Sequence, residues 1–478
     1  MPPARLLPSL SVLLLAVSGC ATLPPAPGAA TIPAECTTLV AALDAAAPGS
    51  PSTPRAVPGW PGLAADRFLA GFDPATLPAP AIDAWRQRLA GAGRGREALQ
   101  RARLPDAPPA PLAPVATLAA RLDACRAASL AAAAAPAALA RLHAAAQVPS
   151  DYSTVARVLG LWPLSVLPVQ ALGARYRQET LARLADPPPP PATTQRFGPL
   201  PAPPQAVGRL RRDALDVPVP TAAQLDALFA LHAPVFEIDG RTDADLPGRP
   251  LRRADGRLDF RPEPRVYQWP SLSRLHGRPV LQLNWLIWFA ARPPAAGALY
   301  AGRLDGLIWR VTLDADGRPY VYDSIHACGC YHLLFPRAGL RLTAAAAALA
   351  ETPIAPYPAP AFRPGRHLRL RIASATHYLI ALDEDDGRPF VPYRSVDYTA
   401  LYTDTDTDAD ADAGTQTLFD PDGLIPGSER PERWLLWPMG VASAGAMRER
   451  GRHAIAFVGE RHFDDPGLPA DWLEESPP

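Results

Sequence analysis

Apolar residues in the first part of the chain recur with the spacing of an α-helix. Between residues 32 and 186 they return every three or four positions, as at Leu118, Leu122 and Cys125, which places them on one helix face. Pro163 and Pro168 interrupt the apolar stretch near the end of this region, and proline removes a helical hydrogen bond. The pattern predicts an α-helical domain over residues 32–186, with its later helices broken at the two prolines.

A proline-rich stretch follows the helical region. Residues 187–191 are five consecutive prolines, and more prolines follow up to residue 204. Proline lacks a backbone N–H and fits neither a helix interior nor a central strand. The composition predicts a stiff, extended linker over residues 187–205.

Residues 206–478 show the pattern of strands joined by tight turns. Asp-Gly pairs begin at Asp239, Asp255, Asp316 and Asp386, and this dipeptide between alternating segments favours hairpins. The sequence therefore predicts an α+β protein, in which the helical domain precedes a mainly antiparallel β domain, either a sandwich or a strongly curved sheet. The acidic, low-complexity segment 403–414 is predicted to be a solvated loop, because it lacks the glycine and glutamate of a calcium-binding loop.

Alternation within residues 280–289 separates two faces of one predicted strand. Leu281, Leu283 and Trp285 fall on one face, whereas Gln282 and Asn284 share the other with large apolar residues. The first face is predicted to be core. The second face suits a lined cleft, with Asn284 as a supporting site residue, or a buried and satisfied amide network.

The first twenty residues carry an export pattern. Arg5 precedes an apolar stretch that ends in the sequence Val17-Ser-Gly-Cys20, and about twelve apolar residues are too few to span a bilayer. The four residues resemble the lipobox of bacterial lipoproteins. That resemblance implies a signal peptide over residues 1–19 and acylation of Cys20 with palmitate-type chains.

The same resemblance implies a location. Residues 20–31 would form a lipidated tether, and Ala21 in place of aspartate after the cysteine implies sorting to the outer membrane, on its periplasmic side. The implied partners are the membrane, through the lipid anchor, and an envelope ligand or protein.

Composition excludes several function classes. The chain has 478 residues and no lysine, so all 47 basic residues are arginine, and they balance 47 acidic residues. The absence of lysine excludes a Schiff-base lysine and a P-loop lysine. Without a basic excess, nucleic-acid binding is not expected.

Two cysteines lie in the predicted helical domain. Cys36 and Cys125 would both meet an oxidising compartment if the chain is exported. A disulfide between them is the favoured interpretation, and two buried free thiols are the alternative.

The stretch from residue 320 to 336 concentrates candidate chemistry between two predicted strands. His326, Cys328, Cys330 and His332 lie within seven residues. In a straight strand they would point to one side but extend over about 20 Å, whereas zinc bonds its ligands at about 2.0–2.3 Å. A shared metal ion therefore requires a chain reversal at Gly329, the residue there that is free to adopt positive φ.

Four interpretations of this cluster remain open. The first is a Cys328–Cys330 disulfide that acts as a structural clip or a redox pair. The second is a zinc site that uses two or more of His326, Cys328, Cys330 and His332. The third is that the thiols are buried and the histidines are satisfied by local partners.

The remaining interpretation is a thiolate nucleophile. Either cysteine would attack, either histidine would act as the base, and Asp323 or Asp305 would orient that histidine. The leading hypothesis is nevertheless a lipid-anchored envelope protein whose β domain binds a ligand or partner. A hydrolase, metal-dependent or cysteine-type, is the alternative, and thiol–disulfide redox chemistry is the third.

Overall fold

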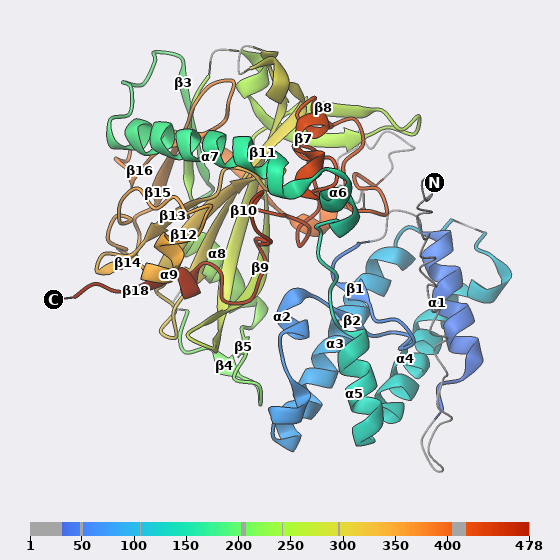
Figure 1. Cartoon of the computed structure of the whole chain (residues 1–478). Helices are drawn as coiled ribbons and strands as arrows, with labels where there is room; N and C mark the ends of the chain where they lie inside the picture. Colours follow the sequence, from blue (N-terminus) through green and yellow to red (C-terminus); the bar gives the residue numbers. More distant parts are fainter. Residues whose placement is uncertain are drawn as a thin grey trace, which may run out of the picture.

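The computed structural model describes residues 31–47, 51–105, 107–201, 207–240, 242–294, 297–403 and 417–477. A group of helices lies beside a large curved sheet (Figure 1), and the predicted α+β class is confirmed. Cys20 and nearly all of the acidic loop predicted at 403–414 lie outside the described residues. No described helix has the length and apolar character that a membrane crossing requires.

Five helices build the first part of the structure. They are α1 (Ala34–Ala46), α2 (Arg67–Ala70), α3 (Ala79–Arg101), α4 (Val115–Ala132) and α5 (Pro136–Ala145), with the short strand pair β1 (Arg55–Ala56) and β2 (Ala64–Ala65). Trp85 of α3 is fully buried and its indole N–H donates to the carbonyl of Leu69 at 2.9 Å. The predicted disulfide is confirmed, since Cys36 of α1 is bonded to Cys125 of α4.

A twelve-stranded sheet forms the second part. Its strands are β3 (Thr194–Pro199), β6 (Val235–Asp239), β7 (Pro247–Arg252), β8 (Leu258–Pro262), β9 (Arg265–Leu275), β10 (Arg278–Arg292), β11 (Gly302–Leu313), β12 (Pro319–His326), β13 (Leu333–Pro336), β15 (Leu368–Ile372), β16 (Leu379–Glu384) and β17 (Val391–Asp397). The main path runs β13-β12-β11-β10-β9-β17-β3-β6-β15-β16. Pairing is antiparallel except where β17 meets β9 and β3 and where β15 meets β6. The prediction of a mainly antiparallel domain is confirmed.

Both faces of the central strands are buried. The face of β10 that carries Leu281, Leu283 and Trp285 packs into one core, as its alternation predicted, and Leu286 and Trp288 pack into a second core on the other face. The indole of Trp288 lies over its cross-strand neighbour on β11, where a Cβ on Gly306 would approach the ring to 2.6 Å. Glycine at this position therefore allows the close β10–β11 contact that places Asp305 beside the core.

Helix α7 (Trp162–Ala185) follows the short α6 (Thr154–Leu159) and lies across one face of the sheet (Figure 1). It is a continuous helix that contains Pro168, so the prediction of breaks at the prolines is corrected: Pro163 occupies the first turn, where no N–H is required, and Pro168 is on the exposed side. Near its C-terminal end, Leu184 packs into the sheet core. This helix belongs structurally to the sheet.

The predicted linker over 187–205 also contains sheet structure. Residues 194–199 form β3, which pairs with β6 and β17, because the prolines at 187–191 end before this strand begins. Conversely, the hairpin of β4 (Arg211–Arg212) and β5 (Pro218–Val219) lies near the helices, and Leu215 and Val217 join the helical core. The predicted linker thus contributes β3 to the sheet, and the β4–β5 hairpin of the predicted β domain packs with the helices.

Candidate functional site

The chain reverses at Gly329, as a shared site required. Gly329 has φ of +95° and the next turn residue, Tyr331, has φ of +64°. The N–H of His326 donates to the carbonyl of Cys330 at 2.9 Å, which closes the turn before β13 pairs with β12. A Cβ at residue 329 would lie 2.4 Å from the carbonyl oxygen of Ala454. Conformation and space both require glycine here.

The reversal does not gather the four candidate zinc ligands. The imidazole of His326 hydrogen-bonds with Asp305 through Nδ1 at 3.2 Å, whereas that of His332 hydrogen-bonds with Asp323 through Nε2 at 2.9 Å. His326 and Asp323 lie three positions apart on β12 and so face opposite sides of the sheet. Within the described ranges, no three His, Cys, Asp or Glu side chains are grouped closely enough to hold a metal ion. The predicted zinc site on His326, Cys328, Cys330 and His332 is therefore corrected.

Cys328 and Cys330 are free thiols in the structure, so the proposed bond between them is not present. Cys328 packs into the core on the Asp323 side of the sheet, and Cys330 lies against that core. A hydrogen bond with Cys328 raises the pKa of Cys330 well above its usual value, and burial adds to the shift. Cys330 is thus held as a thiol, and the imidazoles of the turn are directed at carboxylates and not at sulfur.

Asn284 has the satisfied amide environment that was one of its two interpretations. Its side-chain N–H groups donate to the carbonyl of Trp269 at 3.1 Å and to the hydroxyl of Ser271 at 2.9 Å. Ser271 in turn donates to Gln282, which donates to Thr312. This network lies away from His326 and supports the packing of β9, β10 and β11.

The densest polar contacts surround Asp305 on β11. This carboxylate is fully buried and lies 3.0 Å from Nδ1 of His377, as well as 3.2 Å from Nδ1 of His326. The guanidinium of Arg430 lies 3.1 Å away, and that of Arg292 lies 4.0 Å away. Asp305 therefore connects segments that are far apart in the sequence, and it was one of two acids, with Asp323, predicted to orient either His326 or His332.

The two histidines on Asp305 carry different charges. Burial alone would lower the pKa of His377, but its hydrogen bonds and ion pairs with Asp245 and Asp305 outweigh burial, so the pKa is raised. Burial lowers the pKa of His326 and the nearby Arg292 adds to this, although Asp305 opposes the shift. Burial would raise the pKa of Asp305, but Arg430 and the histidines hold it well below its usual value. The surroundings thus favour an ionised Asp305 between a protonated His377 and a neutral His326.

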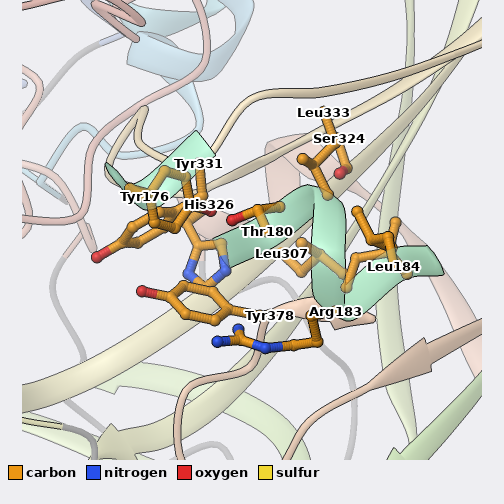
Figure 2. Close-up of a pocket in the computed structure, with 11 residues that line it drawn as sticks. Tyr176, Thr180, Arg183, Leu184, Leu307, Ser324, His326, Tyr331, Leu333 and Tyr378 are labelled. Carbon is orange, nitrogen blue, oxygen red and sulfur yellow. The ribbon is translucent and has the colours of Figure 1, made fainter. Parts of the chain in front are cut away.

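Neutral His326 presents its second nitrogen to a recess beneath α7. Nδ1 is the nitrogen that donates to Asp305, so Nε2 is an acceptor. Nε2 is buried and has no hydrogen-bond partner among the residues that the structure describes. Figure 2 shows the imidazole among the rings of Tyr176, Tyr331 and Tyr378. The apolar part of the lining comes from leucines, namely Leu184, Leu307, Leu333 and Leu379.

Several members of this site were not predicted. His377 lies in the turn between β15 and β16 with φ of +52°, and no metal-like or catalytic spacing marks it in the sequence. Arg292 and Arg430 are two of 47 arginines in a chain without lysine, so composition concealed them. Tyr378 accepts a hydrogen bond from Arg292 at 2.9 Å, a contact that only the fold reveals.

No family model, curated protein or solved structure matches this chain.

The raised pKa of His377 predicts a pH-dependent contribution to stability. Asparagine at this position can still donate a hydrogen bond to Asp305 but cannot become positively charged. Because the ion pairs with Asp305 and Asp245 are then lost, His377→Asn should lower the free energy of unfolding by about 3 kcal/mol near pH 6. The ordinary pKa is 6.5 and the folded value is higher, so this difference should be fully present below pH 6.5 and decline as pH rises through the folded pKa. Urea unfolding between pH 5 and 9 measures it.

His232 provides the control of opposite sign. Burial lowers its pKa to about 4, so wild type should lose stability relative to His232→Gln as pH falls below 6.5. A His377→Asn difference that does not change with pH would show that His377 is not protonated in the native state.

Proposed function

We propose that this protein is anchored in the cell envelope through an acylated Cys20 and that its sheet domain binds a small neutral molecule in the recess at His326. One observation carries the binding proposal: Nε2 of His326 is a buried, unpartnered acceptor that faces the recess. Leaving a buried polar atom unpaired costs roughly 1–3 kcal/mol. A ligand that donates a hydrogen bond to Nε2 removes this cost.

The lining of the recess defines the chemistry of the ligand. Leucine side chains and tyrosine rings suit an apolar or aromatic body, and neutral His326 requires an O–H or N–H donor. Arg183, the charged residue of the lining, stacks over the ring of Tyr378 at 5.5 Å. The adjacent positive charges of Arg292 and His377 are balanced by Asp305 and Asp245. A hydroxyl- or amide-bearing apolar molecule therefore fits better than an ion.

The recess has a volume of about 10 Å³, room for about one water molecule, so a larger ligand enters only when α7 moves. Tyr176, Thr180, Arg183 and Leu184 of this helix close one side of it (Figure 2). Only Val166, Thr180 and Leu184 are buried in a helix of 24 residues. Such a lightly packed element opens at low free energy compared with the sheet beneath it.

Phenol and anisole form a matched probe pair, because only phenol has an O–H donor. We expect phenol to raise the melting temperature of wild type and anisole to bind about tenfold more weakly, since anisole leaves the buried acceptor unpaired, which costs about 1–3 kcal/mol. His326→Asn keeps the donor to Asp305 and removes the acceptor, and it should abolish the difference between the probes. Thermal shift and ligand-observed NMR measure the affinities of wild type and the variant for the two probes.

His332→Gln is the matched control for that variant. His332 is a part-buried histidine that is paired with Asp323 of β12, and it lies on the other face of the sheet from His326. The His332→Gln variant should bind phenol as tightly as wild type does. Equal affinity for the two probes, or equal loss in both histidine variants, would contradict the site.

The anchor is tested separately by metabolic labelling with an alkyne analogue of palmitate. Wild type expressed in a diderm bacterium should incorporate the label and fractionate with the outer membrane. Cys20→Ser should lose both properties, whereas Cys330→Ser should keep them. Labelling that persists in Cys20→Ser would contradict the proposed anchor.

A second candidate function is proton-transfer catalysis at the same atom. The specific observation is that Asp305 orients His326 through Nδ1 and leaves Nε2 free, which is the arrangement of a general base. Hydrolysis of a bound ester by a water held at Nε2 is the reaction that this base supports.

Ester probes of phenol, such as phenyl acetate, test the second candidate. Because the pKa of His326 is lowered, any turnover should persist below pH 6.5 and fall only when His326 becomes protonated. Asp305→Asn should reduce kcat more than KM, and His332→Gln should change neither. Binding of phenol without turnover of its ester would leave the recess as a binding site.

A further inference from the structure

Large exposed apolar side chains are concentrated in two short segments of the structure. Of fourteen such side chains among the described residues, seven lie between residues 155 and 172 and three lie between residues 434 and 437. The first segment covers α6 and the N-terminal half of α7. The second comprises α10 (Arg433–Leu436) and the start of the 3₁₀ helix Trp437–Met439.

These two segments form one surface. The N–H of Ser153 donates to the carbonyl of Gly440 at 2.8 Å, and Arg157 Nε donates to the carbonyl of Met439 at 2.9 Å. Gly160 packs so closely on Pro438 that a Cβ would lie 2.4 Å away. We use the term apolar face for the exposed leucines and valines of residues 155–172 together with Trp434, Leu435 and Trp437.

The apolar face lacks charge at its centre. Arg157 is the only charged residue between positions 155 and 174, and it turns toward the body of the protein, where it bonds to Glu460 at 2.7 Å and to the carbonyl of Gly459 at 2.8 Å. Arg433 stacks on Trp434 at 4.7 Å at the margin. Leucines and valines beside two exposed tryptophans, with arginine at the edge, are typical of a surface that enters the interfacial region of a bilayer.

We propose that the apolar face lies on a phospholipid bilayer, in the interfacial layer, while the protein is held there by its N-terminal anchor. The proposal rests on the proposed acylation of Cys20. From Cys20 to Thr31, the first described residue, there are eleven peptide steps, so the folded part begins within about 40 Å of the bilayer. A patch of ten large apolar side chains in contact with water is unusual for a soluble protein. A bilayer that lies within reach of the tether would cover this patch.

Depth-dependent quenching by brominated phospholipids tests this placement. The full chain is purified from the envelope and reconstituted into vesicles of phosphatidylethanolamine and phosphatidylglycerol that contain phosphatidylcholine brominated along one acyl chain. Trp434 and Trp437 are exposed by 69% and 42%, and most other tryptophans are buried. We expect brominated lipid to quench wild type strongly and to lose more than half of that quenching in Trp434→Ser/Trp437→Ser.

The matched control is Val115→Ser/Val391→Ser, which removes two exposed apolar side chains outside the apolar face and should leave quenching unchanged. A chain that floats with the vesicles without quenching of Trp434 and Trp437 would retain the anchor and overturn the membrane-facing surface. If the chain is not acylated, the same protein is added to preformed vesicles, where quenching supports the proposal and its absence overturns it. Dimerisation that Trp434→Ser/Trp437→Ser abolishes, in the absence of quenching, would assign the face to a second copy of the chain.

Discussion

The ionised carboxylate of Asp305 is the constraint on which the candidate site depends. It is fully buried and holds partners from β12, from the β15–β16 turn and from the segment that contains Arg430. A buried carboxylate without partners would be strongly destabilising, by several kcal/mol. These separated segments must therefore assemble together, and the position of His326 follows from that assembly and not from the turn in which it lies.

The same carboxylate separates the roles of its two histidines. His377 also faces Asp245 at 3.4 Å, so two negative charges favour its protonated form. Burial lowers the pKa of His326, and the nearby Arg292 and Arg430 add to the shift against its one carboxylate, so its neutral form is favoured. Because neutral imidazole has one donor and one acceptor, fixing the donor on Asp305 determines where the acceptor points. The recess thus receives a hydrogen-bond acceptor whose orientation is set by a buried ion pair.

The sequence predicted those features that local pattern determines. Alternation assigned the faces of β10, the two cysteines of the helical region suggested the Cys36–Cys125 bond, and Gly329 was the residue able to reverse the chain. The four predicted ligands do not share a metal site because His326 and His332 lie on opposite faces of the sheet, where Asp305 holds the first and Asp323 holds the second. His377 lies fifty-one residues beyond His326 and has no local signal. Long-range pairing, which contributes most of the site, leaves no trace in a single sequence.

Helix α7 connects the recess at His326 with the apolar face. Its C-terminal half closes the recess with Tyr176, Thr180 and Leu184, whereas its N-terminal half is apolar and exposed. A helix that packed all of its leucines into the sheet would be held more firmly by roughly 1.5–3 kcal/mol for each additional buried side chain. It would then close the recess more tightly, at the expense of ligand entry. The exposure of Leu164, Leu167 and Leu172 therefore leaves α7 less firmly held on the sheet, and the proposed bilayer contact would stabilise the helix from its outer side.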